Sequence, residues 1–157
     1  MKRLHAVAMT LILLAAPALA AQRFVRTSGT EPVVADSLTG LVWQGCAAGL
    51  TGDACTGTPT TMSWADAVAY CDGLTWASKT DWYLPDPKEL RSLVDNRRSI
   101  PAIDPVAFPA TPSSWFWTSS SLANSASDAW VVYFDYGLVS HYGKSSSYSV
   151  RCVRGGP

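Results

Sequence analysis

The side chains that could carry out catalysis are few in this sequence. His141 is one of two histidines, and the other, His5, lies in the apolar N-terminal segment. His141 could form a hydrolytic triad with Asp128 or Asp135 and one of many serines, but the Gly-x-Ser-x-Gly motif that presents a serine nucleophile is absent. We therefore predict that the protein is not an enzyme. A hydrolase that uses His141 is the alternative.

Carboxylates and cysteines do not form a familiar catalytic or metal-binding pattern either. A glycosidase needs two facing carboxylates, yet the only glutamates are Glu31, near the start, and Glu89, which is expected to cap a helix. The cysteines lack the paired Cys-x-x-Cys units of a zinc site. We predict no cofactor, with calcium as the possible exception, although EF-hand spacing is missing and capping or turn formation would also explain its candidate ligands. These are Asp81, Asp86, Asp95, Asn96 and Asp104.

Two patterns favour binding instead of catalysis. Residues 119–128 are rich in Ser, Asn and Asp, which is typical of adaptable binding loops, although a solvated connector would look the same. Aromatic residues recur on the strands predicted in the last third, where alternation turns about half of them outward unless something covers them. Exposed rings can stack on sugars or anchor a protein, and core packing is the alternative. The predicted ligand-binding residues are Trp115, Trp117, Ser120, Asn124, Asp128, Tyr133, Tyr136, His141 and Tyr142.

The first 20 residues have the three parts of a secretory signal peptide. Lys2 and Arg3 precede an apolar run over 4–16, and small residues at 18 and 20 favour cleavage after Ala20. The run is shorter than the ~20 residues that span a bilayer. We predict a periplasmic or secreted, cell-surface protein of a bacterium, with no membrane span after cleavage.

The charge balance argues against nucleic acid as a partner. The chain has 12 basic and 12 acidic residues, and cleavage would remove Lys2 and Arg3, which leaves a net charge of −2. No basic patch stands out in the rest of the sequence, whereas nucleic-acid binding depends on one.

Four cysteines in an exported chain predict two disulfides. Three pairings are possible, and we favour Cys46–Cys55 with Cys71–Cys152. The residues between Cys46 and Cys55 read as a flexible loop that can close on itself. Cys71 lies on the apolar face of a predicted helix, and Cys152 shares strand parity with Val150.

Two helices have clear start signals. The first is predicted over 63–72, where Ser63 is the N-cap and Asp66 completes a capping-box-like pair. Its apolar face includes Cys71, and Gly73 ends it. The second is predicted over 87–95, with Asp86 as N-cap and Glu89 in the box.

The remaining chain reads as short strands and loops. Strands are predicted over 33–35 and 41–43 around a turn at 36–40, and later over 115–119, 129–134, 138–142 and 148–153. Four prolines between 96 and 114 indicate an irregular connection. The fold class is therefore α+β, with two short helices packed on small antiparallel β-sheets.

An ordered set of short motifs resembles the C-terminal domain family of the Legionella collagen-like protein. The motifs are Thr-Gly-Leu-Val-Trp at 39–43, Ser-Trp-Ala-Asp-Ala at 63–67, Asp-Trp-Tyr-Leu-Pro at 81–85, Glu-Leu at 89–90, Phe-Pro at 108–109, Trp-Thr-Ser-Ser at 117–120 and Arg-Cys-Val-Arg at 151–154. The chain departs from the family at Tyr83, where an arginine is usual, and it has no collagen-like stalk.

The resemblance implies a C-type-lectin-like fold, close to the formylglycine-generating branch, in which a cysteine of the first helix pairs with one of the last strand. The Cys71–Cys152 pairing fits that expectation. The lectin calcium signature Trp-Asn-Asp and the paired active-site cysteines of formylglycine-generating enzymes are both absent. We therefore expect a signal peptide over 1–20, a loose lead-in over 21–32 and one lectin-like domain over 33–154.

The function that these patterns favour is an exported, non-catalytic binding module. Its ligand would be a glycan or a protein at the cell envelope or surface. A structural or assembly component of an envelope complex is the alternative, and it would expose a contiguous apolar patch and no pocket.

Overall fold

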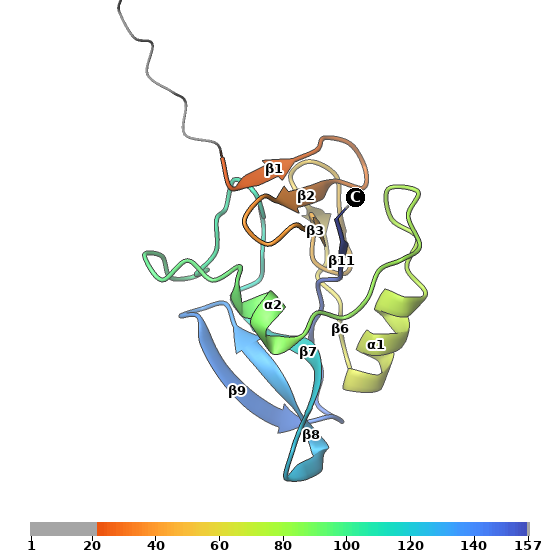
Figure 1. Ribbon diagram of the computed structural model, residues 1–157, viewed down its shortest axis with the longest axis vertical. Helices are drawn as coiled ribbons and strands as arrows, with labels where there is room; N and C mark the ends of the chain where they lie inside the picture. The colour runs from red at the N-terminus through yellow and green to blue at the C-terminus, as the bar shows by residue number, and fades with distance from the viewer. Residues whose placement is uncertain (1–21, 157) are drawn as a thin grey trace, which may run out of the picture.

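A computed structural model describes residues 22–156, in which two short helices accompany three β-sheets (Figure 1). The predicted signal peptide, residues 1–20, lies outside the described residues. One sheet has the order β1 (Phe24–Arg26), β2 (Val33–Asp36), β3 (Leu41–Gln44) and β11 (Val153–Gly155). A second has the order β6 (Thr61–Met62), β10 (Tyr148–Ser149), β7 (Trp115–Leu122), β8 (Ser125–Tyr133) and β9 (Leu138–Gly143). The smallest pairs β4 (Leu50–Thr51) with β5 (Thr56–Gly57).

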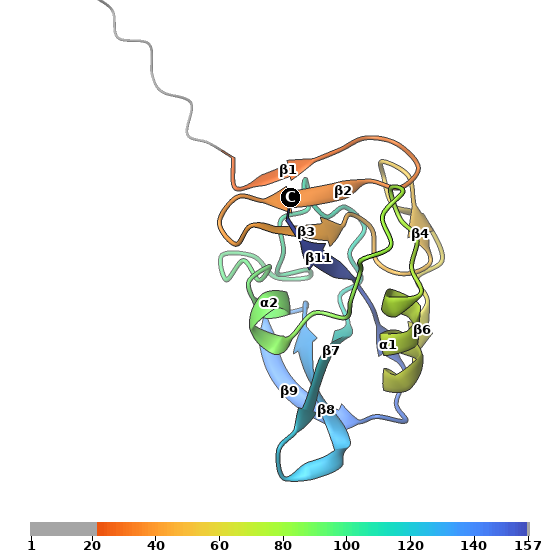
Figure 2. The same ribbon diagram turned by 45° about the vertical axis from the view of Figure 1, so that its right-hand side comes forward.

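The two larger sheets lie at opposite ends of the domain. Figures 1 and 2 both place β1, β2, β3 and β11 at one end, and the long β7–β8 hairpin extends away from them at the other. All neighbouring strands are antiparallel except β10 and β7. The prediction of a small protein with few helices, antiparallel sheets and two disulfides is confirmed.

The predicted turn between β2 and β3 forms as expected. The Asp36 carboxylate accepts hydrogen bonds from the Leu38 amide (3.0 Å) and the Thr39 hydroxyl (2.9 Å), and the Gly40 amide donates to the Asp36 carbonyl. Gly40 has a φ of 73°, which a residue without a Cβ adopts at no steric cost. The local chemistry of the turn thus sets the register of β2 on β3.

The predicted loose lead-in over 21–32 is wrong for the residues that the structure describes. β1 pairs with β2 through the register Phe24↔Asp36. Arg23 donates to both carboxylate oxygens of Asp36 (2.9 and 2.7 Å), and Arg26 donates to the backbone carbonyls of Gly45 and Ala107 (both 2.9 Å). These partners lie far along the chain, so no local pattern could indicate them.

Asp36 should make the stability of the fold depend on pH. Burial alone would raise its pKa, but hydrogen bonds from Arg23, Leu38 and Thr39 outweigh burial and hold the pKa below the usual 3.8. A carboxylate of this kind stabilises the fold above its unfolded pKa, and the contribution is lost as the pH falls through the folded value. We expect Asp36→Asn to lower the free energy of unfolding by about 2 kcal/mol at pH 7.

Urea unfolding of the wild type and of Asp36→Asn at pH 7 and at pH 3 checks this expectation. The difference between the two proteins should shrink at the lower pH, because a carboxylate whose pKa is lowered by folding loses its stabilising contribution once the pH falls below its unfolded pKa. An equal difference at both pH values would show that the stabilisation does not depend on the charge of the Asp36 carboxylate.

The first helix, α1 (Trp64–Asp72), matches its prediction. Ser63 is the N-cap and accepts a hydrogen bond from the Asp66 amide (3.3 Å), while Ala67 and Cys71 are the buried residues of the helix. Gly73 follows the last turn with a φ of −92°, so it ends the helix without the left-handed conformation common at this position.

The second helix, α2 (Pro87–Arg91), is shorter than predicted. Its capping box is present, since the Glu89 amide donates to Asp86 (2.7 Å) and the Asp86 amide donates to Glu89 (2.8 Å). Beyond Arg91 the chain tightens into turns, in which the amides of Ser92, Leu93 and Val94 each donate to a carbonyl three residues back. Leu90 in the helix and Leu93 in the following turn are both buried. The apolar pattern that predicted a longer helix therefore includes residues of this turn.

The C-terminal segment predicted as one strand over 148–153 is split between two sheets. β10 ends at Ser149 and β11 begins at Val153, and the three residues between them are fully buried. Their backbone carbonyls still find partners, because Ala48 donates to Val150 and Gln44 donates to Cys152 (both 2.9 Å). The segment therefore connects the two sheets through the interior.

Both predicted disulfides are confirmed. Cys71 of α1 pairs with Cys152, with a Cα–Cα distance of 5.5 Å, and Cys46 pairs with Cys55 at 5.3 Å. The prediction that residues 47–54 form a flexible loop needs correction, because this segment contributes β4 and buries Leu50. The small disulfide loop is thus part of the core.

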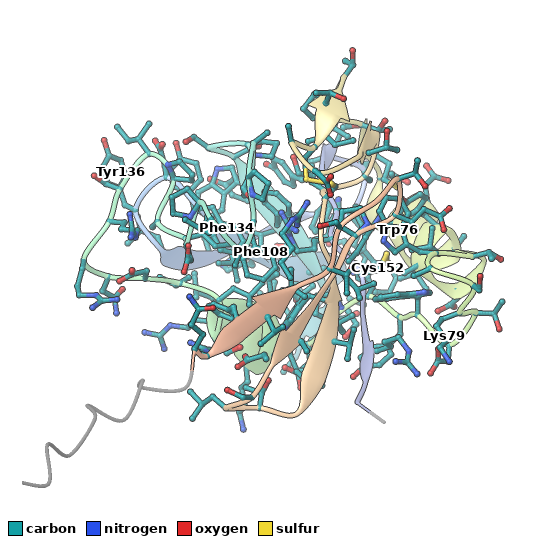
Figure 3. All side chains as sticks on the ribbon, turned by 90° about the horizontal axis from the view of Figure 1, so that it is seen from above. Trp76, Lys79, Phe108, Phe134, Tyr136 and Cys152 are labelled. Carbon is teal, nitrogen blue, oxygen red and sulfur yellow. A yellow bond between two sulfur atoms is a disulfide. The ribbon has the colours of Figure 1, made fainter. Side chains whose placement is uncertain are left out.

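The core joins the sheets, the helices and the proline-rich connection. Phe116 of β7 meets Phe134 edge to face at 5.1 Å, and both rings are fully buried. The connection over 96–114 is irregular, as predicted, yet it contributes Ile103 and Phe108 to the interior. Figure 3 shows Phe108 and Phe134 together near the centre, whereas Tyr136 lies at the periphery.

Candidate functional site

Strands β7, β8 and β9 hold the predicted ligand-binding aromatics at defined positions. Trp115 of β7 is opposite Tyr133 of β8, and Tyr142 of β9 is opposite Ala129 of β8. Paired residues, and residues two apart on one strand, point to the same side of a sheet. The register therefore places Trp115, Tyr133 and Tyr142 on one face.

Five aromatic side chains form a continuous layer on that side, which we call the aromatic face. Trp115 stacks on Tyr133 with ring centroids 4.4 Å apart and meets Tyr142 edge to face at 5.1 Å. Tyr136 extends the layer beyond Tyr133 at 6.3 Å, and Tyr148 of β10 extends it beyond Tyr142 at 5.3 Å. Tyr136 and Tyr142 are 57% and 37% exposed, and the other three rings are half-buried.

Two phenols of the aromatic face, those of Tyr133 and Tyr148, keep their protons at neutral pH. A hydrogen bond to Asp135 (2.8 Å) raises the pKa of Tyr133, and burial raises the pKa of Tyr148. Neutral phenols both donate and accept hydrogen bonds, and their rings offer apolar surface. The face can therefore contact a ligand that is apolar on one side and hydroxylated at its edges.

Tyr148 was missing from the predicted ligand-binding residues. It reaches the aromatic face because β10 pairs with β7 in parallel, through Ser149 opposite Phe116. A parallel pairing of two strands far apart in sequence leaves no local signal. The sequence shows that Tyr148 and Val150 share strand parity. It does not show which strand Tyr148 pairs with.

Trp117 is a correction to the predicted site. It shares parity with Trp115, yet it is fully buried, and its indole donates to the Met62 carbonyl (2.9 Å). Tyr148 packs against it with ring centroids 4.9 Å apart. Because its indole bonds to Met62 of β6 and the ring of Tyr148 from β10 packs on it, Trp117 belongs to the core.

The polar binding loop predicted over 119–128 is mostly strand. β7 continues to Leu122 and β8 begins at Ser125, so only two residues form the tip of a hairpin. Ser120 is half-buried within β7, whereas Asn124 is exposed at the tip. Neither residue of this tip, Ala123 or Asn124, has a positive φ, so the turn makes no special backbone demand for asparagine.

Asp128 and His141 lie together on the opposite side of the sheet from the aromatic face. His141 Nδ1 is 3.2 Å from Asp128 Oδ2, and the imidazole meets the Trp130 indole edge to face at 5.9 Å. The His141 side chain is 47% exposed on the sheet surface. Among the described residues Asp128 is its one hydrogen-bonding partner, and the Ser127 hydroxyl donates to Asp128 instead (3.3 Å). A hydrolytic triad is thus not assembled there.

A model of a known protein family covers the strands that form this site. The family model described as the Lcl C-terminal domain matches residues 32–154. The chain belongs to the Lcl C-terminal domain family. A comparison with curated proteins finds no similar sequence. The match spans β2 to β11 and so contains every strand of the aromatic face.

Tyr83 shows how this member of the Lcl C-terminal domain family accommodates its departure from the family motif. The Tyr83 hydroxyl donates to Glu89 Oε1 (2.9 Å), and the Tyr83 amide donates to the Val153 carbonyl (2.8 Å). Burial and the neighbouring Glu89 raise the pKa of Tyr83 to about 12. A hydrogen bond from the neutral phenol to the Glu89 side chain therefore supports the α2 capping box here.

The candidate calcium ligands of this Lcl C-terminal domain serve other roles. Asp86 caps α2, Asp95 pairs with Arg97 (2.9 Å) and Arg98 (3.1 Å), and Asp104 accepts hydrogen bonds from backbone amides. Asp81 pairs with Arg154 (2.7 Å), and Asn96 is exposed. Within residues 22–156, no group of three or more His, Cys, Asp or Glu side chains is placed to hold a metal ion.

Helices long and apolar enough to cross a bilayer are absent from the part of the chain that the structure describes. The two disulfides are typical of an oxidising environment outside the cytoplasm.

Proposed function

We propose that this domain is an exported, non-catalytic binding module with a C-type-lectin-like fold, and that it recognises a glycan through the aromatic face. The observation that carries the proposal is the continuous layer of five aromatic rings. Four of them lie on strands β7, β8, β9 and β10, and the fifth lies in the turn between β8 and β9. The disulfides and the N-terminal signal-like segment support export.

The chemistry of the aromatic face suits a sugar better than a charged ligand. Sugar rings present C–H groups on their faces and hydroxyls at their edges. The rings of Trp115 and Tyr142 offer apolar surface to such faces, and the phenol hydroxyls offer both donors and acceptors to the edges. Because a paired sheet holds the rings, little side-chain entropy is lost on binding.

The proposal predicts a loss of glycan binding when the exposed rings are removed. Tyr136→Ala and Tyr142→Ala together should weaken the affinity at least tenfold, because truncating an anchoring ring costs more than about 1 kcal/mol. Both side chains are exposed, so the fold should tolerate the changes. A glycan array identifies the ligand, and titration calorimetry with that glycan gives the affinities.

His141→Ala is the matched control, since His141 is exposed on the other side of the same strand. It should bind the glycan as the wild type does. If the wild-type protein bound no glycan on the array, glycan recognition would be refuted. Hydrolysis of an array glycan that His141→Ala abolishes would support the hydrolase alternative instead.

A further inference from the structure

A groove of about 510 Å³ lies between α2 and strand β9, on the side of the sheet opposite the aromatic face. Figures 1 and 2 both place α2 beside the β8–β9 pair. The walls come from Pro87, Lys88 and Arg91 of α2, and the floor comes from Trp130 and Val139. Leu138, which pairs with Tyr133, borders the groove at the start of β9. The volume falls within the range of small-molecule sites, roughly 300–1,000 Å³.

The helix side of the groove carries two cations without partners. Leu90 is fully buried and anchors α2 on the sheet. Lys88 and Arg91 are three positions apart, so they share an exposed side of the helix. Within residues 22–156, neither side chain takes part in an ion pair or a side-chain hydrogen bond.

The carboxylates on the adjoining elements are already engaged. Glu89 accepts hydrogen bonds from Asp86 and from the Tyr83 hydroxyl. Asp128 pairs with His141, and Asp135 accepts from Tyr133. Among residues 22–156, no carboxylate therefore forms an ion pair with either cation at the rim of the groove.

The floor of the groove is apolar and partly open to solvent. The Trp130 indole is half-buried, Val139 is 38% exposed, and the bordering Leu138 is 55% exposed. The register pairs Val139 with Val132, two residues from Trp130, so Val139 and Trp130 point to the same side. An indole beside aliphatic groups offers a flat surface for an apolar ring or short chain.

We propose that this groove binds a small amphipathic carboxylate. The apolar body of the ligand packs on Trp130 and Val139, and its carboxylate accepts hydrogen bonds from Arg91 and Lys88. The planar guanidinium matches a carboxylate through two parallel hydrogen bonds, and the ammonium adds a second, compact charge. This site is independent of the aromatic face, which lies on the other side of the sheet.

Titration of the purified protein with 2-naphthoate, and with its neutral analogue 2-naphthamide, tests the proposal. The carboxylate should bind, and amide-resolved NMR should place its contacts on α2, on β9 and on the Trp130 indole, assigned with Trp130→Phe. Lys88→Gln with Arg91→Gln should weaken the affinity for 2-naphthoate at least tenfold, because each removes a charge-assisted hydrogen bond. The amide should bind weakly and equally to both proteins.

Arg97→Gln is the matched control, since it removes an exposed cation that pairs with Asp95 away from the groove. It should leave the affinity for 2-naphthoate unchanged. Equal binding of carboxylate and amide to the wild type, or contacts confined to the aromatic face, would overturn the proposal. It would also fail if free 2-naphthoate did not bind while a peptide with the same aromatic carboxylate at its C-terminus did.

Discussion

Replacing Cys71 and Cys152 together by alanine should lower the melting temperature by roughly 15 °C. The disulfide joins residues 81 positions apart, and its loss frees about 4.5 kcal/mol of unfolded-state entropy. Each kcal/mol corresponds to about 3–4 °C for a domain of this size. Both cysteines are fully buried, and the bond ties α1 to the segment that connects the two large sheets.

The alanine pair at Cys46 and Cys55 is the control for this prediction. That disulfide joins residues only 9 positions apart, and the same reasoning gives about 2.7 kcal/mol, or roughly 9 °C. Alanine leaves neither a free thiol nor a buried hydroxyl at any of the four sites. Calorimetric melting of both double variants provides the comparison, and equal shifts would show that loop length does not decide the effect.

Arg151→Met should lower the free energy of unfolding by about 3–5 kcal/mol. The guanidinium of Arg151 is fully buried and donates to the Gln44 carbonyl (2.8 Å), the Gly45 carbonyl (3.0 Å) and the Thr111 hydroxyl (2.8 Å). It also lies 4.8 Å from the centre of the Phe108 ring. Methionine fills part of the volume but removes the donor that Arg151 supplies to the Gln44 carbonyl and the Thr111 hydroxyl, while the Gly45 carbonyl keeps its hydrogen bond from Arg26.

Two effects oppose each other at Arg151, and their magnitudes decide the direction. Burial and the nearby Arg26 lower the pKa of Arg151 to about 9, so the group is still a cation at neutral pH and costs free energy to desolvate. Its Nε also has no hydrogen-bond partner. Against this, three hydrogen bonds from a charged donor are each worth about 1.5–3 kcal/mol, and together they outweigh the cost.

Arg154→Met is the matched control for Arg151→Met. Arg154 is three residues away and pairs with the exposed Asp81, so its replacement should change stability little. Urea unfolding of both variants gives the comparison. A gain in stability for Arg151→Met would show that desolvation of the cation exceeds the value of its hydrogen bonds.

The parts of the fold that depend on neighbouring residues were predictable from sequence. The Ser63 cap, the Asp86–Glu89 box and the turn at Asp36 each involve side chains that bond backbone within three residues. The Cys71–Cys152 pairing followed from helix periodicity and strand parity, which report the buried side of each element. These signals are local, so one sequence contains them in full.

The sequence by itself determined that an aromatic strand region and two disulfides would exist, but the tertiary structure decided which rings are exposed. Trp115 and Trp117 have the same parity, yet Trp117 is buried against Met62 of β6 and Tyr148 of β10 while Trp115 joins the aromatic face. Alternation along a strand specifies the side to which a residue points. Whether another element covers that side depends on strand pairings across the whole chain, such as β10 on β7, and these leave no mark in the neighbouring residues.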